Sequence, residues 1–544
     1  MTPPGATTVL IGQVLVSASP TELRTAEAVG LADGRVVAAG RRGDVLDAAA
    51  RGAEVHDFGA MAIVPGLCDF HLHLVGMARA RREVRLDEAR TAEDLVAAMT
   101  TAADGLPPNG WLRGRGWLDA VLAATDLGRL DEAIGRRPAL VSSHDGHSAW
   151  ASPAALARAG VGAATDDPPG GRLERDGRGA PNGILRERAV DLLEGVAEGL
   201  AGPDLDAALR ETLRELGELG VTAAVDAGDA TADGGSGAYA GLGESASVLL
   251  GSSAVDGRLR VWANLPAAAI GWASEAGLRS GDAVPDRDTV RVGWAKAFVD
   301  GALGSRTAAL FEPYTCGEAA DTGIARLTAV DLDALVASAR AAGISLAIHA
   351  IGDRGAATVL DALEHGAERR AAVPPDRMEH LQLLRSEDIP RLVAANVTAS
   401  VQPIHCASDR ELVEACWADR AALAYPWRDL QRTGARIAFG SDAPIESPNP
   451  WLGMFAACHR RFPADGTPDW QPQQALDAAA ALAGYTAGPA AAGGWTDLGH
   501  LQPGARGDLA VLNVSLERLR QGDDGLAGVQ SQLTLLDGRP IHAG

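Results

Sequence analysis

The segment Val64-Pro65-Gly66-Leu67-Cys68-Asp69-Phe70-His71-Leu72-His73 decides the fold. Its apolar run predicts a buried strand over residues 64–70, and two histidines follow that strand directly. Because residues two apart on an extended chain face the same side, His71 and His73 can point in one direction. We therefore expect a strand that ends in two side chains able to bind a metal ion.

Seven further segments of this kind follow, separated by alanine-rich stretches with a helical pattern. Alternating strands and helices are typical of a parallel sheet, and eight such units closed on themselves form a (β/α)₈ TIM barrel. The predicted strands are residues 64–70, 222–226, 259–265, 292–299, 345–349, 377–380, 397–401 and 437–440.

The sequence pattern at both ends of the chain differs from that of the middle. Short β segments with hairpin-type turns occur before residue 64 and again after residue 508. We expect residues 1–64 and 490–544 to form one small β-sandwich domain and residues 65–489 to form the barrel. The first two strands are separated by more residues than a barrel needs, so residues 77–205 are predicted to be an inserted subdomain over the barrel mouth.

Side chains suited to metal binding recur at the predicted strand ends, where catalytic groups of this fold lie. They include four of the twelve histidines of the chain. In chain order they are His71 and His73 on the first strand, Lys296 on the fourth, His349 on the fifth, His380 on the sixth and Asp442 after the eighth.

Lys296 is the only lysine among the 49 basic residues; all others are arginine. A position that stayed lysine in such a chain is expected to need the primary amine itself. A guanidinium keeps its proton in proteins, whereas a buried amine can lose its proton and become a nucleophile.

Together these motifs resemble the amidohydrolase superfamily, and within it the branch that contains N-substituted formamide deformylase. The segments that carry the resemblance are Val64-Pro65-Gly66 leading to His71-Leu72-His73, Asp145-Gly146-His147-Ser148-Ala149-Trp150, Lys296 to Arg306, His349-Ala350-Ile351-Gly352-Asp353, Gly440-Ser441-Asp442-Ala443-Pro444, and the closing stretch from Leu501 to Leu512.

The resemblance implies a metal centre with one or two Zn²⁺ ions, with Mn²⁺, Fe²⁺ or Co²⁺ as alternatives. His71, His73 and Asp442 would hold one ion, and His349 and His380 the other. Neutral imidazoles and carboxylates are suitable ligands for such ions.

The resemblance also implies that Lys296 adds carbon dioxide and becomes N6-carboxylysine, whose two oxygens bridge the metals. A metal-activated hydroxide would attack a carbonyl, with Asp442 as general base, and so cleave a C–N bond in an amide, formamide or cyclic amide. In a single-metal alternative, Lys296 or His380 supports the transition state.

Several other residues are weaker candidates for the site. Arg306, His147 and Trp150 are expected to contact the substrate, although each also has an ordinary structural interpretation. Asp300 could replace Lys296 as a ligand. Two acidic residues near predicted metal-binding histidines in the sequence could orient those ligands: Asp353 and Glu379.

The net charge of −22 argues against nucleic acid or an anionic membrane as a partner. Without an evident signal peptide or membrane span, we expect a cytoplasmic homodimer that acts on a small molecule. The five cysteines are scattered and lack CxxC spacing, so we expect reduced, mostly buried thiols.

Two other functions remain compatible with these residues. One is a metal-dependent decarboxylase or isomerase that uses the same site to stabilise an enolate. The other is a non-catalytic scaffold, which the complete ligand set disfavours.

Overall fold

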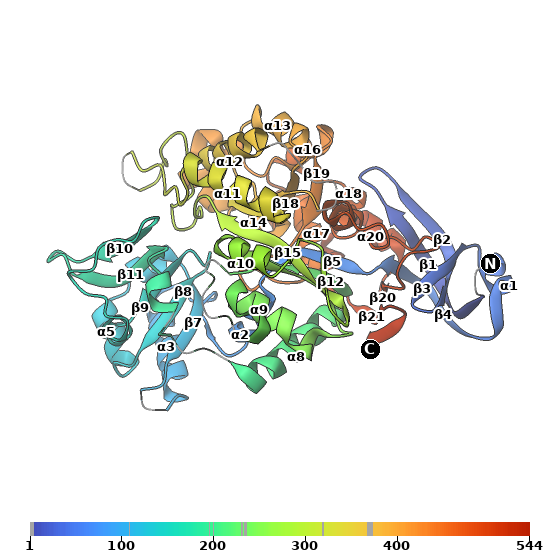
Figure 1. Cartoon of the computed structure of the whole chain (residues 1–544), viewed down its shortest axis with the longest axis horizontal. Coiled ribbons are helices and arrows are strands. Elements are labelled where there is room, and N and C mark those ends of the chain that lie inside the picture. Colours follow the sequence, from blue (N-terminus) through green and yellow to red (C-terminus); the bar gives the residue numbers. More distant parts are fainter. Residues whose placement is uncertain are drawn as a thin grey trace.

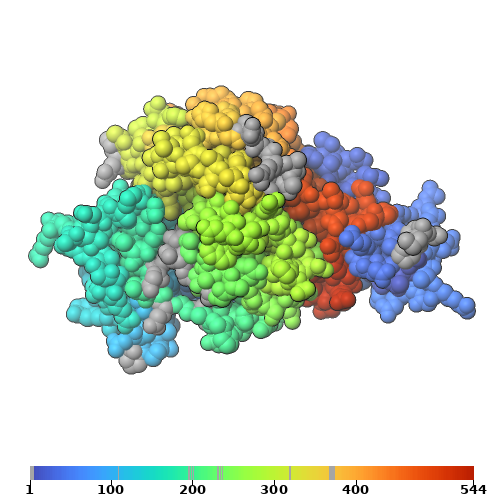
Figure 2. Space-filling model, viewed as in Figure 1, coloured from blue at the N-terminus to red at the C-terminus, as the bar shows by residue number. Residues whose placement is uncertain are grey.

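The computed structural model describes residues 5–544 except 108, 195, 198, 200, 230–231, 233–234, 236, 318–319 and 367–373. The β domain, the barrel and the insertion lie in a row, with both termini on the β domain (Figure 1). The space-filling view shows the insertion as a lobe beside the barrel (Figure 2). Within the described ranges, no helix is long and apolar enough to cross a membrane.

The barrel prediction is confirmed, because eight strands form one parallel sheet in sequence order. Parallel strands covered on both faces are apolar throughout, as in Leu346–Ala350, where every residue is buried. The strands are β5 (Leu67–Leu72), β12 (Val221–Asp226), β13 (Arg260–Pro266), β15 (Arg287–Phe298), β16 (Leu346–Ala350), β17 (Arg377–His380), β18 (Thr398–Val401) and β19 (Arg436–Phe439), with the short β14 (Ala283–Val284) antiparallel to β15.

The barrel closes where the segment after β19 meets β5. The backbone N–H of Asp442 donates to the carbonyl of His71 at 2.7 Å, and that of Ser441 donates to the Asp69 carboxylate at 3.0 Å. A Cβ on residue 440 would lie 2.4 Å from the backbone nitrogen of His71, so only glycine lets the segment after β19 approach β5 this closely.

Helices surround the barrel and fill its connections. Local signals set their ends: Thr328 and Asp331 form a capping box at the start of α11, and Gly343 ends that helix in the left-handed conformation. The helices are α2 (Leu74–Ala80), α8 (Gly202–Glu218), α9 (Glu244–Gly251), α10 (Ile270–Glu275), α11 (Ala329–Ala342), α12 (Asp353–His365), α13 (Asp388–Ala394), α14 (Pro403–Ser408), α15 (Arg410–Cys416), α16 (Trp427–Arg432), α17 (Pro450–His459), α18 (Ala478–Gly484), α19 (Ala487–Gly493) and α20 (Leu516–Gln521).

The predicted β domain made from both termini is also confirmed. Its strands form one seven-stranded sheet in which β20 pairs with β4, joining the two ends of the chain. The elements are β1 (Ala6–Ala18), β2 (Leu23–Ala32), β3 (Arg35–Gly40), α1 (Arg42–Asp47), β4 (Ala49–Pro65), β20 (Leu509–Leu512), β21 (Ser531–Leu536) and β22 (Arg539–Ala543).

The insertion after the first barrel strand has its own six-stranded sheet and its own hydrophobic core. The boundaries 77–205, 65–489 and those of the β domain stay predictions. The elements are β6 (Val84–Arg85), α3 (Ala92–Asp104), β7 (Leu112–Trp117), α4 (Asp119–Ala123), α5 (Leu127–Ala133), β8 (Ala139–Ser143), β9 (Ser148–Ala151), α6 (Pro153–Arg158), β10 (Gly171–Arg175), β11 (Pro181–Glu187) and α7 (Asp191–Glu194).

The cysteine prediction is wrong for two of the five residues. Cys316 and Cys416 form a disulfide, although 100 positions separate them. Cys316 lies in the loop after β15 and Cys416 ends α15, and the fold brings these segments together: the N–H of Thr315 donates to the carbonyl of Cys416 at 2.9 Å. Sequence spacing reports local motifs and carries no sign of such a long-range pair.

Candidate metal centre

The predicted strand-end residues converge at the carboxyl end of the barrel. Five of the six are buried: His71, Lys296, His349, His380 and Asp442. The sixth, His73, directly follows β5 and its side chain is 31% exposed, so one side of the cluster faces the pocket above it.

Asp442 lies at the centre of the cluster. Its Oδ1 is 3.4 Å from Nε2 of His71 and 3.3 Å from Nε2 of His73. Its Oδ2 is 3.7 Å from Nε2 of His405. Two groups of residues that could hold a metal ion therefore include this carboxylate: one with His71 and His73, and one with His380 and His405.

Several ring nitrogens in this cluster are buried and have no hydrogen-bond partner among the described residues. They are Nε2 of His71, Nδ1 of His349, Nδ1 of His380 and Nε2 of His405. Buried polar atoms are nearly always paired, so a group of unpaired imidazole nitrogens beside a carboxylate fits a divalent metal ion.

For two of these histidines, the opposite ring nitrogen is fixed by an acceptor. Nδ1 of His71 donates to the Glu379 carboxylate at 2.5 Å, and Nε2 of His349 donates to the Gly301 carbonyl at 3.1 Å. Each bond places the proton on the far nitrogen and leaves the lone pair of the near nitrogen facing the cluster. Metal-binding histidines are typically oriented in this way.

Electrostatics favour neutral His349 and His380 and an ionised Asp442, whereas Asp442 raises the pKa of His73 against the effect of burial. Burial lowers the pKa of both His349 and His380 well below the ordinary value, and neighbouring histidines lower it further. Burial alone would raise the pKa of Asp442, but His71 and His73 outweigh it and hold the pKa well below the ordinary value. These are the protonation states that metal ligands require.

Lys296 is only 2% exposed, and its Nζ lies 4.8 Å from the centre of the Phe298 ring. Burial lowers its pKa from 10.5 to about 8, although Glu379 and Asp442 oppose this change. Its positive charge opposes protonation of His73, His349 and His380.

The insertion completes the pocket above the cluster. His144, Asp145 and His147 line it together with His349, His380 and Asp442 of the barrel. The rings of His147 and His349 are 4.9 Å apart. His147 therefore lies where a substrate contact was predicted.

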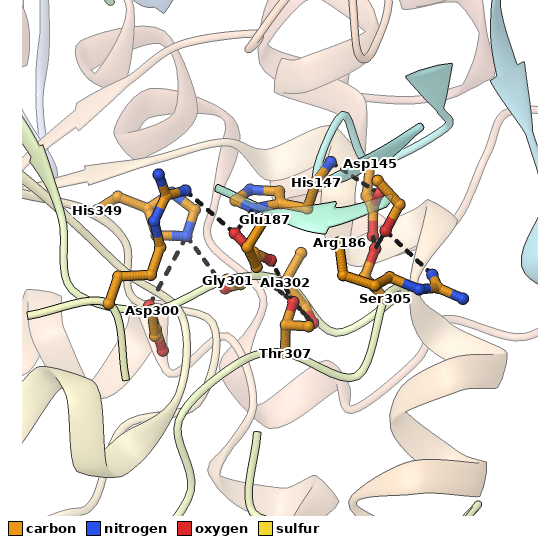
Figure 3. A network of polar contacts seen from close by, with 12 residues as sticks. Asp145, His147, Arg186, Glu187, Asp300, Gly301, Ala302, Ser305, Thr307 and His349 are labelled. Carbon is orange, nitrogen blue, oxygen red and sulfur yellow. Dashed lines mark hydrogen bonds and ion pairs between the residues drawn. The ribbon is translucent and has the colours of Figure 1, made fainter. Parts of the chain in front are cut away.

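Figure 3 shows how polar contacts join the insertion to the loop after β15. Glu187 accepts from Nδ1 of His147 at 3.1 Å, from the Thr307 hydroxyl at 2.5 Å and from Arg326 at 3.1 Å. The Ser305 hydroxyl donates to Asp145 at 2.6 Å. These buried contacts fix the insertion wall of the pocket relative to His349.

Two predicted substrate contacts do not reach the pocket. Trp150 is 2% exposed and packs in the hydrophobic core of the insertion, because both faces of its strand are covered. Arg306 is directed at the insertion, where its Nη2 lies 3.7 Å from Asp119. Neither residue is among the described residues that line the pocket, and substrate contacts from Trp150 and Arg306 stay predictions.

Of the three remaining weaker candidates, Glu379 contacts a predicted metal ligand, whereas Asp300 and Asp353 accept hydrogen bonds from backbone groups. Glu379 orients His71, as expected. Asp300 accepts three backbone N–H groups, at 2.8, 2.9 and 3.1 Å, so its carboxylate is committed to the loops around it and not to a metal. Asp353 accepts the backbone N–H groups of Phe311 and Arg354 and does not contact His349 in any hydrogen bond among the described residues.

Sequence reasoning missed His405 and the outer pocket residues His144, Asp409 and Glu446. His405 lies four residues beyond the end of β18, inside α14. The usable signal was a histidine soon after the seventh predicted strand. His144 has its pKa raised to about 10 by hydrogen bonds to Asp87 and Glu446.

The chain is similar to known proteins over most of its length. It is 29% identical over 445 residues to the putative amidohydrolase YtcJ of Bacillus subtilis (strain 168), covering 78% of this chain and 79% of that protein. It is 27% identical over 502 residues to N-substituted formamide deformylase of Arthrobacter pascens, covering 90% of both.

Among solved structures, an uncharacterized metal-dependent hydrolase from Pyrococcus horikoshii OT3 has the same fold, with a TM-score of 0.73 at 24% identity, covering 95% of this chain and 99% of that one. The sequence pattern of the amidohydrolase family matches residues 54–542. Since that match covers most of the chain, including the insertion and the whole barrel, the chain belongs to the amidohydrolase family.

Proposed function

We propose that this amidohydrolase-family protein is a metal-dependent hydrolase that cleaves a C–N bond in an amide, formamide or cyclic amide. The observation that carries the proposal is the group of buried imidazole nitrogens without partners among the described residues, gathered around Asp442. A divalent ion held there would acidify water and polarise a carbonyl group.

The donor set favours Zn²⁺, with Mn²⁺, Fe²⁺ or Co²⁺ as alternatives. His71, His73 and Asp442 would hold one ion. His349 and His380 would contribute to a second, and Lys296 as N6-carboxylysine would supply oxygen ligands between the two.

Two properties of Lys296 support its carboxylation. Its lowered pKa leaves part of the amine neutral near pH 8, and only a neutral amine can add carbon dioxide. A buried ammonium would also repel any cation bound by the neighbouring histidines, whereas a carbamate attracts it.

Asp442 is the proposed general base. Its carboxylate is ionised and contacts ring nitrogens of two histidines. It would take a proton from the attacking water and deliver it to the leaving nitrogen, so that an amide and water become an acid and an amine. In the single-metal alternative, Lys296 or His380 would support the transition state.

The test combines metal analysis with an unbiased amide and formamide library. We expect one to two equivalents of divalent metal per chain and release of amine from at least one substrate, with Asp442→Asn as the inactive control. Release of carbon dioxide without amine would favour a decarboxylase instead. Metal below a tenth of an equivalent after metal-replete expression would contradict the proposal.

The proposal includes a small-molecule substrate and a cytoplasmic homodimer. Light scattering of purified protein tests the dimer, and cell fractionation tests the location. The Cys316–Cys416 disulfide is the observation that weighs against a reducing compartment.

A further inference from the structure

The two ring nitrogens of His405 have different environments. The side chain is 8% exposed and lines the pocket. Nδ1 is 3.3 Å from Nε2 of Gln382, whereas Nε2 is 3.7 Å from Oδ2 of Asp442 and has no hydrogen-bond partner within the described part of the chain. The ring stacks parallel to that of His380 at 5.9 Å.

The contact with Gln382 determines where the proton of His405 lies. An amide nitrogen donates and does not accept, so Nδ1 of His405 must accept. A neutral imidazole carries one proton, which is then on Nε2. The nitrogen that faces Asp442 and the pocket is therefore an N–H donor.

This arrangement is the reverse of that in His71 and His349. In those residues the outer nitrogen donates to Glu379 or to the Gly301 carbonyl, which leaves a lone pair for a metal. The protonated Nε2 of His405 offers no lone pair. His405 therefore lies beside the proposed ligands, but its tautomer has no lone pair directed at a metal ion.

Resting on the proposed hydrolysis, we propose that His405 is a catalytic residue that donates an N–H hydrogen bond from Nε2 to the scissile carbonyl oxygen. The oxygen gains negative charge when water attacks, and a fixed donor stabilises that charge. Asp442, which handles the proton of the water, is the nearest carboxylate to this donor.

Few other side chains of the pocket could donate a hydrogen bond to the scissile carbonyl oxygen. No arginine or lysine is among the described residues that line it. His147 donates to Glu187 through Nδ1, and His144 lies between Asp87 and Glu446. His405 is the pocket histidine whose N–H is directed at the ligand cluster itself.

The competing role is metal ligation, since candidate ligand atoms of His380, His405 and Asp442 all lie within 4.8 Å of one another. Ligation requires a rotated Gln382 amide, with Oε1 accepting from a protonated Nδ1. Nitrogen-15 NMR of the imidazole rings separates the two cases without any activity measurement. We expect a protonated Nε2 in His405, assigned with His405→Gln; a protonated Nδ1 would overturn the proposal.

The kinetic test uses His405→Ala, His405→Gln and Gln382→Glu, each checked for folding by circular dichroism. We expect His405→Ala to keep the metal content and KM of the wild type while kcat falls about 100- to 1000-fold. His405→Gln, which retains an N–H donor, should recover part of that loss. Loss of one metal equivalent in His405→Ala would make His405 a ligand and refute its role as donor.

Gln382→Glu provides a second result, because a carboxylate only accepts and so places a proton on Nδ1 of His405. At a pH where nitrogen-15 NMR shows that this ring carries the Nδ1 proton alone, we expect kcat to fall as in His405→Ala although the histidine remains. The matched control is Gln402→Glu, which makes the same change at a buried glutamine that bonds the Ser400 carbonyl instead. Unchanged kcat in Gln382→Glu would refute the proposal, whereas a wild type that releases no amine from any substrate would refute the hydrolase itself.

Discussion

Replacing Lys296 with methionine should stabilise the metal-free protein while abolishing its activity. The ammonium is almost fully buried, and burial lowers its pKa from 10.5 to about 8. A difference of about 2.5 in pKa corresponds to roughly 3 kcal/mol of unfavourable free energy when the amine is charged in the folded state. Methionine fills a similar volume without a charge, so Lys296→Met should raise the free energy of unfolding by about that amount at pH 7.

The effect has a defined pH dependence. Below pH 8 the amine is protonated in both the folded and the unfolded state, and the full penalty applies. Between pH 8 and 10.5 the unfolded chain binds more protons than the folded one, so the stability of the wild type rises with pH. The advantage of Lys296→Met should therefore be greatest below pH 8 and disappear near pH 10.5.

The assay is urea denaturation of metal-free protein under carbon-dioxide-free gas at pH 7 and pH 10. Lys296→Arg is the matched control, because a guanidinium keeps its charge and should be less stable than the wild type at both pH values. A Lys296→Met protein no more stable than the wild type at pH 7, or an advantage at pH 10 as large as that at pH 7, would refute the reasoning.

Three further predictions concern the site and its frame. Asp442→Asn should lower kcat by several orders of magnitude with the fold intact, and near-wild-type turnover would exclude Asp442 as the base. Glu379→Gln should weaken metal binding 10- to 100-fold, measured by competition with a chelator, because the orientation of His71 is lost; unchanged affinity would contradict that role. Cys316→Ser should lower the free energy of unfolding by up to about 5 kcal/mol, and a reductant should bring the wild type to the same level. Equal denaturation midpoints for variant, reduced and oxidised protein would show that the disulfide adds nothing.

The barrel and most strand-end residues could be predicted because both depend on local pattern. Apolar runs mark buried parallel strands, and a residue at a strand end inherits its position from the fold. His349 and His380 were found in this way. Residues at the strand ends could be predicted without information on contacts between distant segments.

The residues that were missed or misplaced depend on contacts between distant segments. His405 lies on a helix four residues beyond its strand, so its position after the seventh predicted strand is a weaker signal than a position at the strand end. Trp150 and Arg306 share motifs with pocket residues, but their direction is set by the insertion core and by Asp119. The partner of Cys316 becomes visible only when the loops over the barrel mouth meet.

The junction between the first and last barrel strands fixes the timing of site assembly. Ser441 and Asp69, which bond there, are 372 positions apart, and a proposed metal ligand follows each of them: His71 after Asp69 and Asp442 after Ser441. At about 5–20 residues per second, a ribosome needs about 20–75 s to synthesise the intervening chain. The nascent protein therefore exposes His71 and His73 long before Asp442 exists. The proposed metal site is therefore complete only when synthesis is nearly finished, and an ion bound earlier would be held by an incomplete set of the proposed ligands.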